Sequence, residues 1–233
     1  LTPDEIFSED DKNYYVKKNK QEKVTIGPSE SMSKSKKNTI DPEQMIENYG
    51  ADAVRLFILS DSPPEKDIQW SEQGMVASYK FINKFWGLHK KILISENITS
   101  DIFDESLEQF TNQILLRMNV SLNKFSYNVI VANLHEIYTF FNKVIESKII
   151  NNNLINNYIK ILTMMLPITP HLANECLSEI TKDKKFYWPE INKKYLEKNQ
   201  HNIVIQINGK KRGLILIENN ISKDDLIEKI KKE

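Results

Sequence analysis

Hydrophobic residues recur every three to four positions from Ser71 to about residue 180. This spacing puts them on one side of an α-helix and is typical of helices that pack against one another. We therefore expect an antiparallel helical bundle over residues 71–185. The expected stripes are Met75, Tyr79, Ile82 and Trp86; Leu107, Phe110, Ile114, Met118, Leu122 and Phe125; Val131, Leu134, Tyr138, Phe141 and Ile145; Leu154, Tyr158, Ile161 and Met165; and Leu172, Cys176, Leu177 and Ile180 in a last helix from Pro170.

The first 70 residues are more polar. Two short β-prone runs, 14–16 and 23–26, surround a polar turn and predict a hairpin. The triplet Asp41-Pro42-Glu43 is a strong helix start, because it offers an N-cap oxygen, a proline at the first position and an acid in the first turn. Gly50 is expected to end that helix. A second helix, "ADAVRLFILS", should follow, with Val54, Phe57 and Ile58 on one side, until Pro63-Pro64 stops it.

The last 36 residues change character again. The runs "NIVIQI" and "GLILIE" are predicted strands on either side of "NGKKR", a turn signal with three positive charges. A helix capped by Ser222 should follow. The predicted fold is thus mainly α: a loop segment and helices over 1–70, the bundle over 71–185, and the start of a small α+β domain, a truncated β-β-α unit, over 198–233.

Composition narrows the class of protein. The 32 basic and 32 acidic residues cancel, so attraction to nucleic acid must come from local clusters. Cys176 is the single cysteine, which excludes an intrachain disulfide and favours a reducing compartment. The four histidines are far apart, and we expect no metal site. No apolar run is long enough to span a membrane. Because the chain begins at Leu1, we expect a fragment.

One short loop carries candidate chemistry. The eight residues 31–38, "SMSKSKKN", hold three serines and three lysines immediately before the helix start at Asp41. Lys34, with Ser33 and Ser35, can donate hydrogen bonds to the oxygens of a triphosphate and stabilise the charge that develops as pyrophosphate leaves. A mobile loop can also close on ATP and reopen. Composition alone favours a solvated surface loop, because lysine- and serine-rich loops are common.

The segment "SMSKS" resembles the second signature of class I aminoacyl-tRNA synthetases, Lys-Met-Ser-Lys-Ser. The following "KNTIDPEQMIENYGADAVRLFILS" is similar to the same family. Four further segments resemble its leucyl members: "DSPPEKDIQWSEQGMVASYKFINKFW", "PITPH", "YWP" and "IVIQINGKKRG". The resemblance runs from about residue 24 onward. Ser31 stands where the family has its first lysine. Two alternatives stay open: either the loss of this lysine weakens loop closure, or Lys36 or Lys37 partly replaces it.

The resemblance implies ATP-dependent activation of leucine and its transfer to tRNA-Leu, with Mg²⁺ accompanying ATP. It implies an ATP-binding loop formed by Ser31, Met32, Ser33, Lys34 and Ser35, in which Lys34 is catalytic. It also implies transfer-RNA contact near Lys210, Lys211 and Arg212, in a cytoplasmic, monomeric enzyme. The nucleotide-binding fold, the amino-acid pocket and the editing domain of the family would precede Leu1, so this chain alone should be inactive.

Other interpretations stay open. The chain is also compatible with a non-catalytic RNA-binding helical module, or with a valyl, isoleucyl or methionyl synthetase fragment. Asp52 and Arg55 are expected either to brace their helix against the loop or to form a surface salt pair. His171 is interpreted as a helix-terminal structural residue. Packing roles are expected for Trp70, Trp86 and Trp188, and no RNA contact is assigned among Lys80, Lys84, Lys90, Lys91, Arg117 and Lys124.

Overall fold

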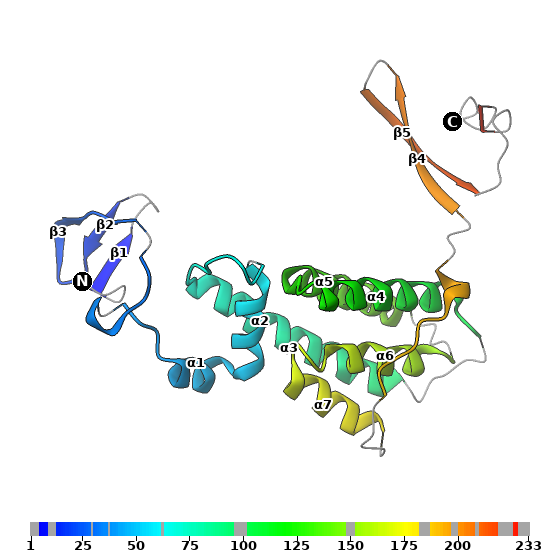
Figure 1. The fold of residues 1–233 in the computed structure, drawn as a ribbon, viewed down its shortest axis with the longest axis horizontal. Helices are drawn as coiled ribbons and strands as arrows, with labels where there is room; N and C mark the ends of the chain where they lie inside the picture. Colours follow the sequence, from blue (N-terminus) through cyan, green and yellow to red (C-terminus); the bar gives the residue numbers. More distant parts are fainter. Residues whose placement is uncertain are drawn as a thin grey trace.

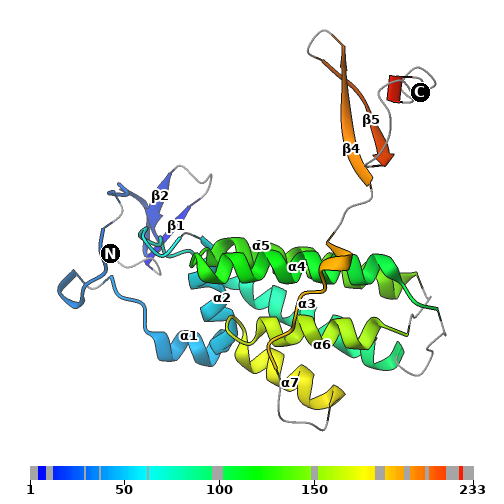
Figure 2. The same ribbon diagram turned by 45° about the vertical axis from the view of Figure 1, so that its right-hand side comes forward.

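The computed structural model is mainly helical, with a small antiparallel sheet near the N-terminus, as predicted (Figure 1). Helices occupy the centre, and a β-hairpin projects from them in both ribbon views (Figures 1 and 2). The structure describes residues 5–8, 13–28, 30–36, 38–61, 63–95, 102–147, 152–181, 187–196, 200–207, 210–218 and 226–227.

The N-terminal sheet has three antiparallel strands in the order β1 (Ile6–Ser8), β2 (Tyr14–Val16) and β3 (Asn19–Val24). Strands β2 and β3 form the predicted hairpin. Strand β3 begins at Asn19, earlier than the predicted run, and its first residues are polar and exposed. Strand β1 was not predicted. It pairs Ile6 with Val16 and places Phe7 against Tyr15, with ring centroids 5.8 Å apart.

Helices α1 (Pro42–Tyr49) and α2 (Ala51–Asp61) follow the loop. The α1 start is as predicted, since Asp41 Oδ1 accepts a hydrogen bond from the Glu43 N–H at 3.0 Å. Gly50 separates the two helices with φ +82°, a conformation that glycine adopts without steric cost.

The predicted apolar side of α2 was partly wrong. Phe57 is buried as predicted, and the other buried apolar residues are Ala53 and Leu56, whereas Ile58 is 46% exposed and Val54 is only half-buried. Helix α2 packs against four helices, α1, α3, α5 and α7. Its buried surface is therefore set by where those neighbours lie and does not follow the 54–57–58 stripe.

The predicted bundle consists of α3 (Glu72–Ser95), α4 (Glu105–Asn123), α5 (Tyr127–Glu146), α6 (Leu154–Met165) and α7 (Pro170–Ile180). Helices α4 and α5 lie side by side above α3 and α6, and α7 lies below α3 and α6 (Figures 1 and 2). The contacts of α4 with α6, and of α3 with both α5 and α7, close one continuous apolar core.

The stripe predicted for α3 was partly wrong. Met75 is fully buried, but Tyr79 is 40% exposed. The main buried row, which lies one position away from the prediction, is Phe81, Phe85, Leu88 and Ile92. Ile82 and Trp86 only flank the core, because α3 buries two of its sides, one against α2 and α7 and the other against α5. At Gly74 an added Cβ would lie 2.8 Å from the Phe57 ring, so the absence of a side chain lets α2 approach closely.

The remaining stripes are confirmed, with one exception. Phe125 lies beyond the end of α4, is 59% exposed and has φ 54° in the turn to α5. Each of the helices α4, α5, α6 and α7 contributes fully buried members of its predicted stripe: Leu107, Ile114, Met118, Leu134, Phe141, Leu154, Tyr158, Ile161, Met165, Cys176 and Leu177.

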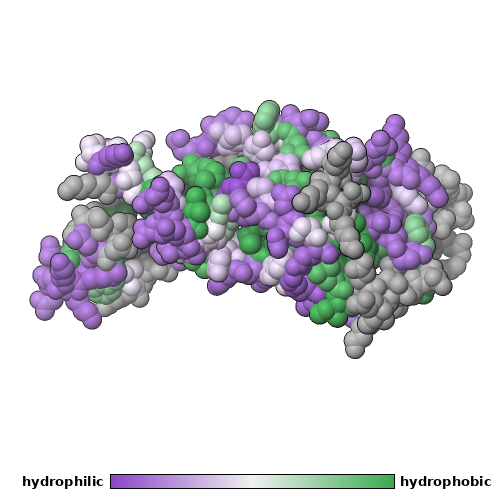
Figure 3. All heavy atoms as spheres, turned by 90° about the horizontal axis from the view of Figure 1, so that it is seen from below, coloured by the Kyte–Doolittle hydropathy of each residue, from purple (hydrophilic) through white to green (hydrophobic). Residues whose placement is uncertain are grey.

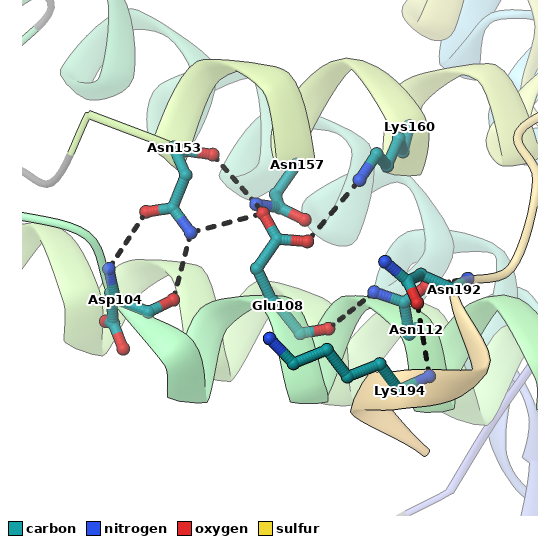
Figure 4. Close-up of polar contacts among 8 residues, drawn as sticks. All are labelled: Asp104, Glu108, Asn112, Asn153, Asn157, Lys160, Asn192 and Lys194. Carbon is teal, nitrogen blue, oxygen red and sulfur yellow. Dashed lines mark hydrogen bonds and ion pairs between the residues drawn. The ribbon is translucent and has the colours of Figure 1, made fainter.

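A buried polar network joins α4 to α6 inside this core (Figure 4). The Glu108 carboxylate accepts hydrogen bonds from Asn157 Nδ2 at 2.6 Å and Asn153 Nδ2 at 3.2 Å. Lys160 Nζ lies 3.5 Å from its second oxygen. One turn further along α4, Asn112 Oδ1 accepts from the Asn192 N–H at 2.7 Å and ties down the segment that follows the bundle. The contacts from Asn153, Asn157 and Lys160 compensate for burying the Glu108 carboxylate.

The C-terminal strands β4 (Gln200–Ile207) and β5 (Lys210–Glu218) form an antiparallel pair, as predicted. Lys210, Lys211 and Arg212 belong to β5 and not to the turn, which is a correction to the predicted "NGKKR" turn. The helix expected from Ser222 lies outside the described residues, apart from a helical pair at 226–227.

Candidate functional site

The candidate nucleotide loop lies between the N-terminal sheet and α1. Asn38 holds it from one side: its Oδ1 accepts from the Ser33 N–H at 2.8 Å, and its Nδ2 donates to the Ser31 carbonyl at 3.3 Å. Residues Lys34–Lys36 form a single 3₁₀ turn. The loop is therefore a closed turn that presents its side chains outward, and Met32 is 48% exposed at its start.

The two described lysines of the loop differ in their partners. Lys36 Nζ forms an ion pair with Glu30 Oε2 at 2.7 Å, which lowers the pKa of the Glu30 carboxyl. Lys34 is exposed, and its ammonium pairs with no carboxylate among the described residues. The Ser33 and Ser35 hydroxyls lie 3.1 Å apart beside it. The described part of the loop thus presents one uncompensated cation next to two hydroxyls, an arrangement suited to an anion.

Of the two candidates to replace the first signature lysine, Lys36 and Lys37, the structure describes only Lys36. Lys36 is already engaged by Glu30 across the loop. Lys37 lies outside the described residues. Ser31, at the signature position itself, is exposed and contributes its backbone carbonyl to the Asn38 contact.

Helix α2 fastens the loop segment to the bundle through Asp52, which is buried. Asp52 Oδ1 accepts from His171 Nδ1 at 2.9 Å and from the His171 N–H at 3.3 Å, while Oδ2 accepts from the Leu172 N–H at 2.7 Å. Thr169, the residue at the N-cap of α7, makes no side-chain capping bond. Asp52 therefore caps α7 from a distant part of the chain.

Arg55 reinforces the same junction, one turn along α2. Its Nη2 donates to the Pro167 carbonyl at 2.7 Å and its Nε to the Ile168 carbonyl at 3.0 Å. Both expectations for Asp52 and Arg55 were wrong, because these side chains neither touch the loop nor pair with each other. They bind the "PITPH" turn, where His171 has the structural role predicted for it. No clear signal in the sequence indicated this contact, because Thr169 before Pro170 is itself a residue type that caps helices.

A pocket of about 510 Å³ opens beside this junction. Its lining is mainly apolar and includes Gly50, Ile82 and Trp86, and Asn83 and Glu175 contribute polar groups. The three tryptophans have mixed surroundings. Trp70 packs edge-on against Phe57 at 5.2 Å and Trp86 flanks the core, as expected, but Trp188 is 46% exposed and donates to Asn119 Oδ1 at 2.9 Å.

A second buried polar cluster lies where α3, α6 and α7 meet. His89 is fully buried, with Nε2 2.9 Å from Glu179 Oε2 and Nδ1 3.3 Å from the Tyr158 hydroxyl. Burial lowers the pKa of His89, and the Glu179 bond opposes that effect. Lys90 Nζ binds both oxygens of Glu179, at 2.6 and 2.7 Å, and lowers the pKa of that carboxyl.

Other candidate chemistry can be stated for the described part of the chain. No group of three or more His, Cys, Asp or Glu side chains there is arranged to hold a metal ion. None of the described helices is both long and apolar enough to cross a membrane. The face seen from below is mostly hydrophilic, with separate hydrophobic patches over the helical part (Figure 3).

Comparison with protein families matches two parts of the chain. Residues 24–71 match the model described as tRNA synthetases class I (I, L, M and V). Residues 104–228 match the anticodon-binding domain of tRNA ligase. The first range contains the whole candidate loop together with α1 and α2, and the second contains α4 to β5.

Several curated relatives are leucine–tRNA ligases. The Bartonella tribocorum protein is 34% identical over 231 residues, which cover 91% of this chain and 25% of the relative. The Wolbachia pipientis protein is 34% identical over 88% of this chain and 26% of its own length. The Rickettsia massiliae protein is 32% identical over 97% of this chain and 27% of its own length. The chain therefore spans about a quarter of the length of these relatives.

A solved structure shares the fold. The Agrobacterium radiobacter K84 agnB2 LeuRS–tRNA–LeuAMS ternary complex matches with a TM-score of 0.72 and 20% identity, over 85% of this chain and 27% of that one. At this identity the likeness concerns the fold alone. Because one family model covers more than half of its residues, the chain belongs to the family of anticodon-binding domains of tRNA ligases.

Proposed function

We propose that the chain is part of a leucine–tRNA ligase, which joins leucine to ATP and transfers it to tRNA-Leu. The observation that carries the proposal is the 32–34% identity to leucine–tRNA ligases over 88–97% of the chain. This range includes the leucyl-type segments after α2 as well as the signature loop. Within the intact enzyme the substrates are leucine, ATP and tRNA-Leu.

Three parts of the chain have different proposed roles. Residues 1–70 close the catalytic region with the ATP loop, residues 71–185 form the transfer-RNA-binding bundle, and residues 198–233 begin a further RNA-contacting domain. In that last part Lys210, Lys211 and Arg212 are the proposed RNA contacts, since phosphate contacts require such charges. The enzyme is proposed to be monomeric and cytoplasmic.

Lys34 is the proposed catalytic residue of the loop. Its ammonium is exposed and unpaired among the described residues, whereas Lys36 is neutralised by Glu30. A cation placed at the β- and γ-phosphates of ATP stabilises the leaving pyrophosphate more in the transition state than in the ground state. Ser33 and Ser35 add hydroxyl donors, and Ser31 and Met32 complete the ATP-binding loop. Mg²⁺ would arrive with ATP, bound by its phosphates.

The test is amino-acid-dependent ATP–pyrophosphate exchange. This chain would replace the corresponding segment of the Bartonella tribocorum ligase, and exchange would be measured with leucine, valine, isoleucine and methionine. We expect exchange with leucine alone. A folded chimaera that shows no exchange but binds tRNA-Leu would overturn the catalytic role and favour a non-catalytic RNA-binding module. Exchange would indicate a working loop, while specificity for leucine reports on the pocket supplied by the rest of the enzyme.

A further inference from the structure

We propose that one exposed face of α3, formed by Lys80, Lys84, Gly87 and Lys91, binds the sugar-phosphate backbone of transfer RNA. The inference rests on the proposed function, and it identifies which side of the bundle meets the RNA. We call these four residues the lysine face.

The helix geometry puts the four residues together. Successive residues of an α-helix are rotated by about 100° and rise 1.5 Å. The three lysines therefore point within roughly 40° of one another, and the lysine face runs for about 16 Å from Lys80 to Lys91. All three lysines are exposed, while Phe81, Phe85 and Leu88 on the adjoining side are buried in the core. The core thus holds the ridge rigidly and directs it outward.

The charges of the lysine face are not neutralised by the described protein. Lys80 and Lys84 make no ion pair there, and Lys91 donates only to the amide oxygen of Asn142, at 3.2 Å. Helix α3 contains a single acidic residue, Glu72, in its first turn. Lys90 is a useful contrast, because it points about 100° away from Lys91 and is neutralised by Glu179.

The helix that packs beside the lysine face adds little negative charge. His135 of α5 lies against the Phe81 ring at 4.3 Å, and the charge of Lys84 is one of the two causes that lower its pKa, after burial. Glu136 of α5 is bound to Arg117 of α4 at 2.8 Å. Glu146 accepts from Asn142 Nδ2 at 2.6 Å, and Oδ1 of the same amide accepts from Lys91, so one carboxylate lies near the Lys91 end of the lysine face. The surface around the lysine face is therefore locally basic although the chain as a whole has no net charge.

Packing among the described residues does not explain Gly87. Glycine in the interior of a helix is unfavourable relative to alanine. A Cβ added at Gly87 would meet no described atom within 4 Å, so no described neighbour requires the glycine. Its position between Lys84 and Lys91 leaves the helix surface flat, where a bulky backbone can approach while the lysines on either side reach its charges.

Phosphodiester backbone is the partner that fits these features. Nucleic acid in a duplex carries a charge about every 3.4 Å along each strand, so a 16 Å ridge faces roughly five phosphates. Three unpaired lysines with few competing carboxylates match such a line of charge. The alternative partner, an acidic protein surface, would require no bare helix surface at Gly87 and becomes an outcome of the test.

The experiment measures binding of the full chain to a tRNA-Leu transcript by fluorescence anisotropy over a range of salt concentrations. Each lost phosphate contact should weaken binding about 8-fold at 0.1 M salt and reduce the log–log salt slope by about 0.9. Lys84→Ala should show this single-contact change, and the triple alanine variant a slope lower by roughly 2 to 3. Lys90→Gln is the matched control and should bind as the unaltered chain does.

Two variants test Gly87 separately. Gly87→Ala should raise the midpoint of thermal unfolding, and Gly87→Gln should weaken tRNA binding several-fold without loss of helix content by circular dichroism. Tight binding by the unaltered chain with unchanged binding of the triple variant would overturn the lysine face and leave the proposed function intact. No tRNA binding by the unaltered chain would contradict both. Competition by an acidic polypeptide as strong as that by unrelated RNA would also overturn the proposal.

Discussion

Asp52 of α2 and His171 of α7 are joined through both the backbone and the side chain of the histidine, with Nδ1 2.9 Å and the N–H 3.3 Å from one carboxylate oxygen. The other oxygen takes the Leu172 N–H. Asp52 thus provides the side-chain cap that Thr169 does not supply to α7. The same helix leads through Gly50 and α1 to the candidate loop, so this junction sets how the loop is carried by the bundle.

Asp52→Ala should lower the free energy of unfolding by about 2 kcal/mol. The change removes a helix cap and leaves two backbone N–H groups without their acceptor. Asp52→Asn, which keeps one acceptor oxygen, should lose less. Urea denaturation followed by circular dichroism measures both. Equal stability of Asp52→Ala and the unaltered protein would contradict the capping role.

Glu108→Ala should destabilise the protein by about 3 kcal/mol. It removes one of the two acceptors of each buried amide nitrogen, so Asn153 keeps only the Asp104 carbonyl and Asn157 only the Asn153 carbonyl. Glu108→Gln keeps an acceptor and should recover part of the loss. Glu105, an exposed acid in the first turn of the same helix, provides the control: Glu105→Ala should cost less than 1 kcal/mol. Chemical denaturation of the three variants tests this ordering.

Stability should fall as the pH drops below 6.5, because of His89. Its pKa is lowered by burial from the usual 6.5, so the unfolded chain takes up a proton at a pH where the folded chain does not. The contribution of His89 to the free energy of unfolding therefore rises with pH between the folded pKa and 6.5. It is fully present above about pH 7 and is lost in acid. His89→Gln should flatten this part of the profile, measured by urea denaturation from pH 5 to pH 8.

The pH profile needs one control. The pKa of His135 is also lowered, by burial and by Lys84, so His135→Gln should remove only its own share of the dependence. A profile unchanged in His89→Gln would mean that the buried cluster does not titrate in this range.

Cys176 should be inert in the folded protein. Its side chain is fully buried, and burial raises the pKa of the thiol to about 12. Because the thiolate is the reactive form, a thiol reagent such as DTNB at pH 8 should label the native chain very slowly. In urea, one thiol per chain should react at once. Rapid labelling under native conditions would contradict the buried position.

In the chimaeric ligase, Lys34→Ala should lower leucine-dependent ATP–pyrophosphate exchange by on the order of 100-fold, since one preorganised donor at a developing charge contributes about that much. The thermal midpoint should not change, because the side chain is exposed. Lys36→Ala is the matched control and should have a much smaller effect, as Lys36 is held by Glu30. Ser31→Lys should raise the exchange rate if the first signature position contributes to loop closure. Comparable rates for the Lys34 and Lys36 variants would remove the proposed role of Lys34.

Local patterns predicted much of the secondary structure. The α1 start needed only Asp41, Pro42 and Glu43, because capping is an interaction between neighbours. The stripes of α5, α6 and α7 also held, since each of these helices buries one main side. Prediction was partly wrong for α2 and α3, where packing against several helices moved the buried side. It was also wrong for Phe125, which lies in the turn between α4 and α5. The domain boundaries and the roles of the loop residues stay predictions.

The sequence by itself determined that α1 begins after Asp41 and ends at Gly50, that α7 begins at Pro170, and that a basic, serine-rich loop precedes α1. Only the tertiary structure decided that Asp52 and Arg55 bind the turn before α7, that His89 is buried against Glu179, and that the α3 lysines divide into a neutralised Lys90 and an unpaired face. The reason is physical. Periodicity and caps depend on residues within one turn of each other, whereas these contacts join side chains about 90 to 120 positions apart, which only packing brings together.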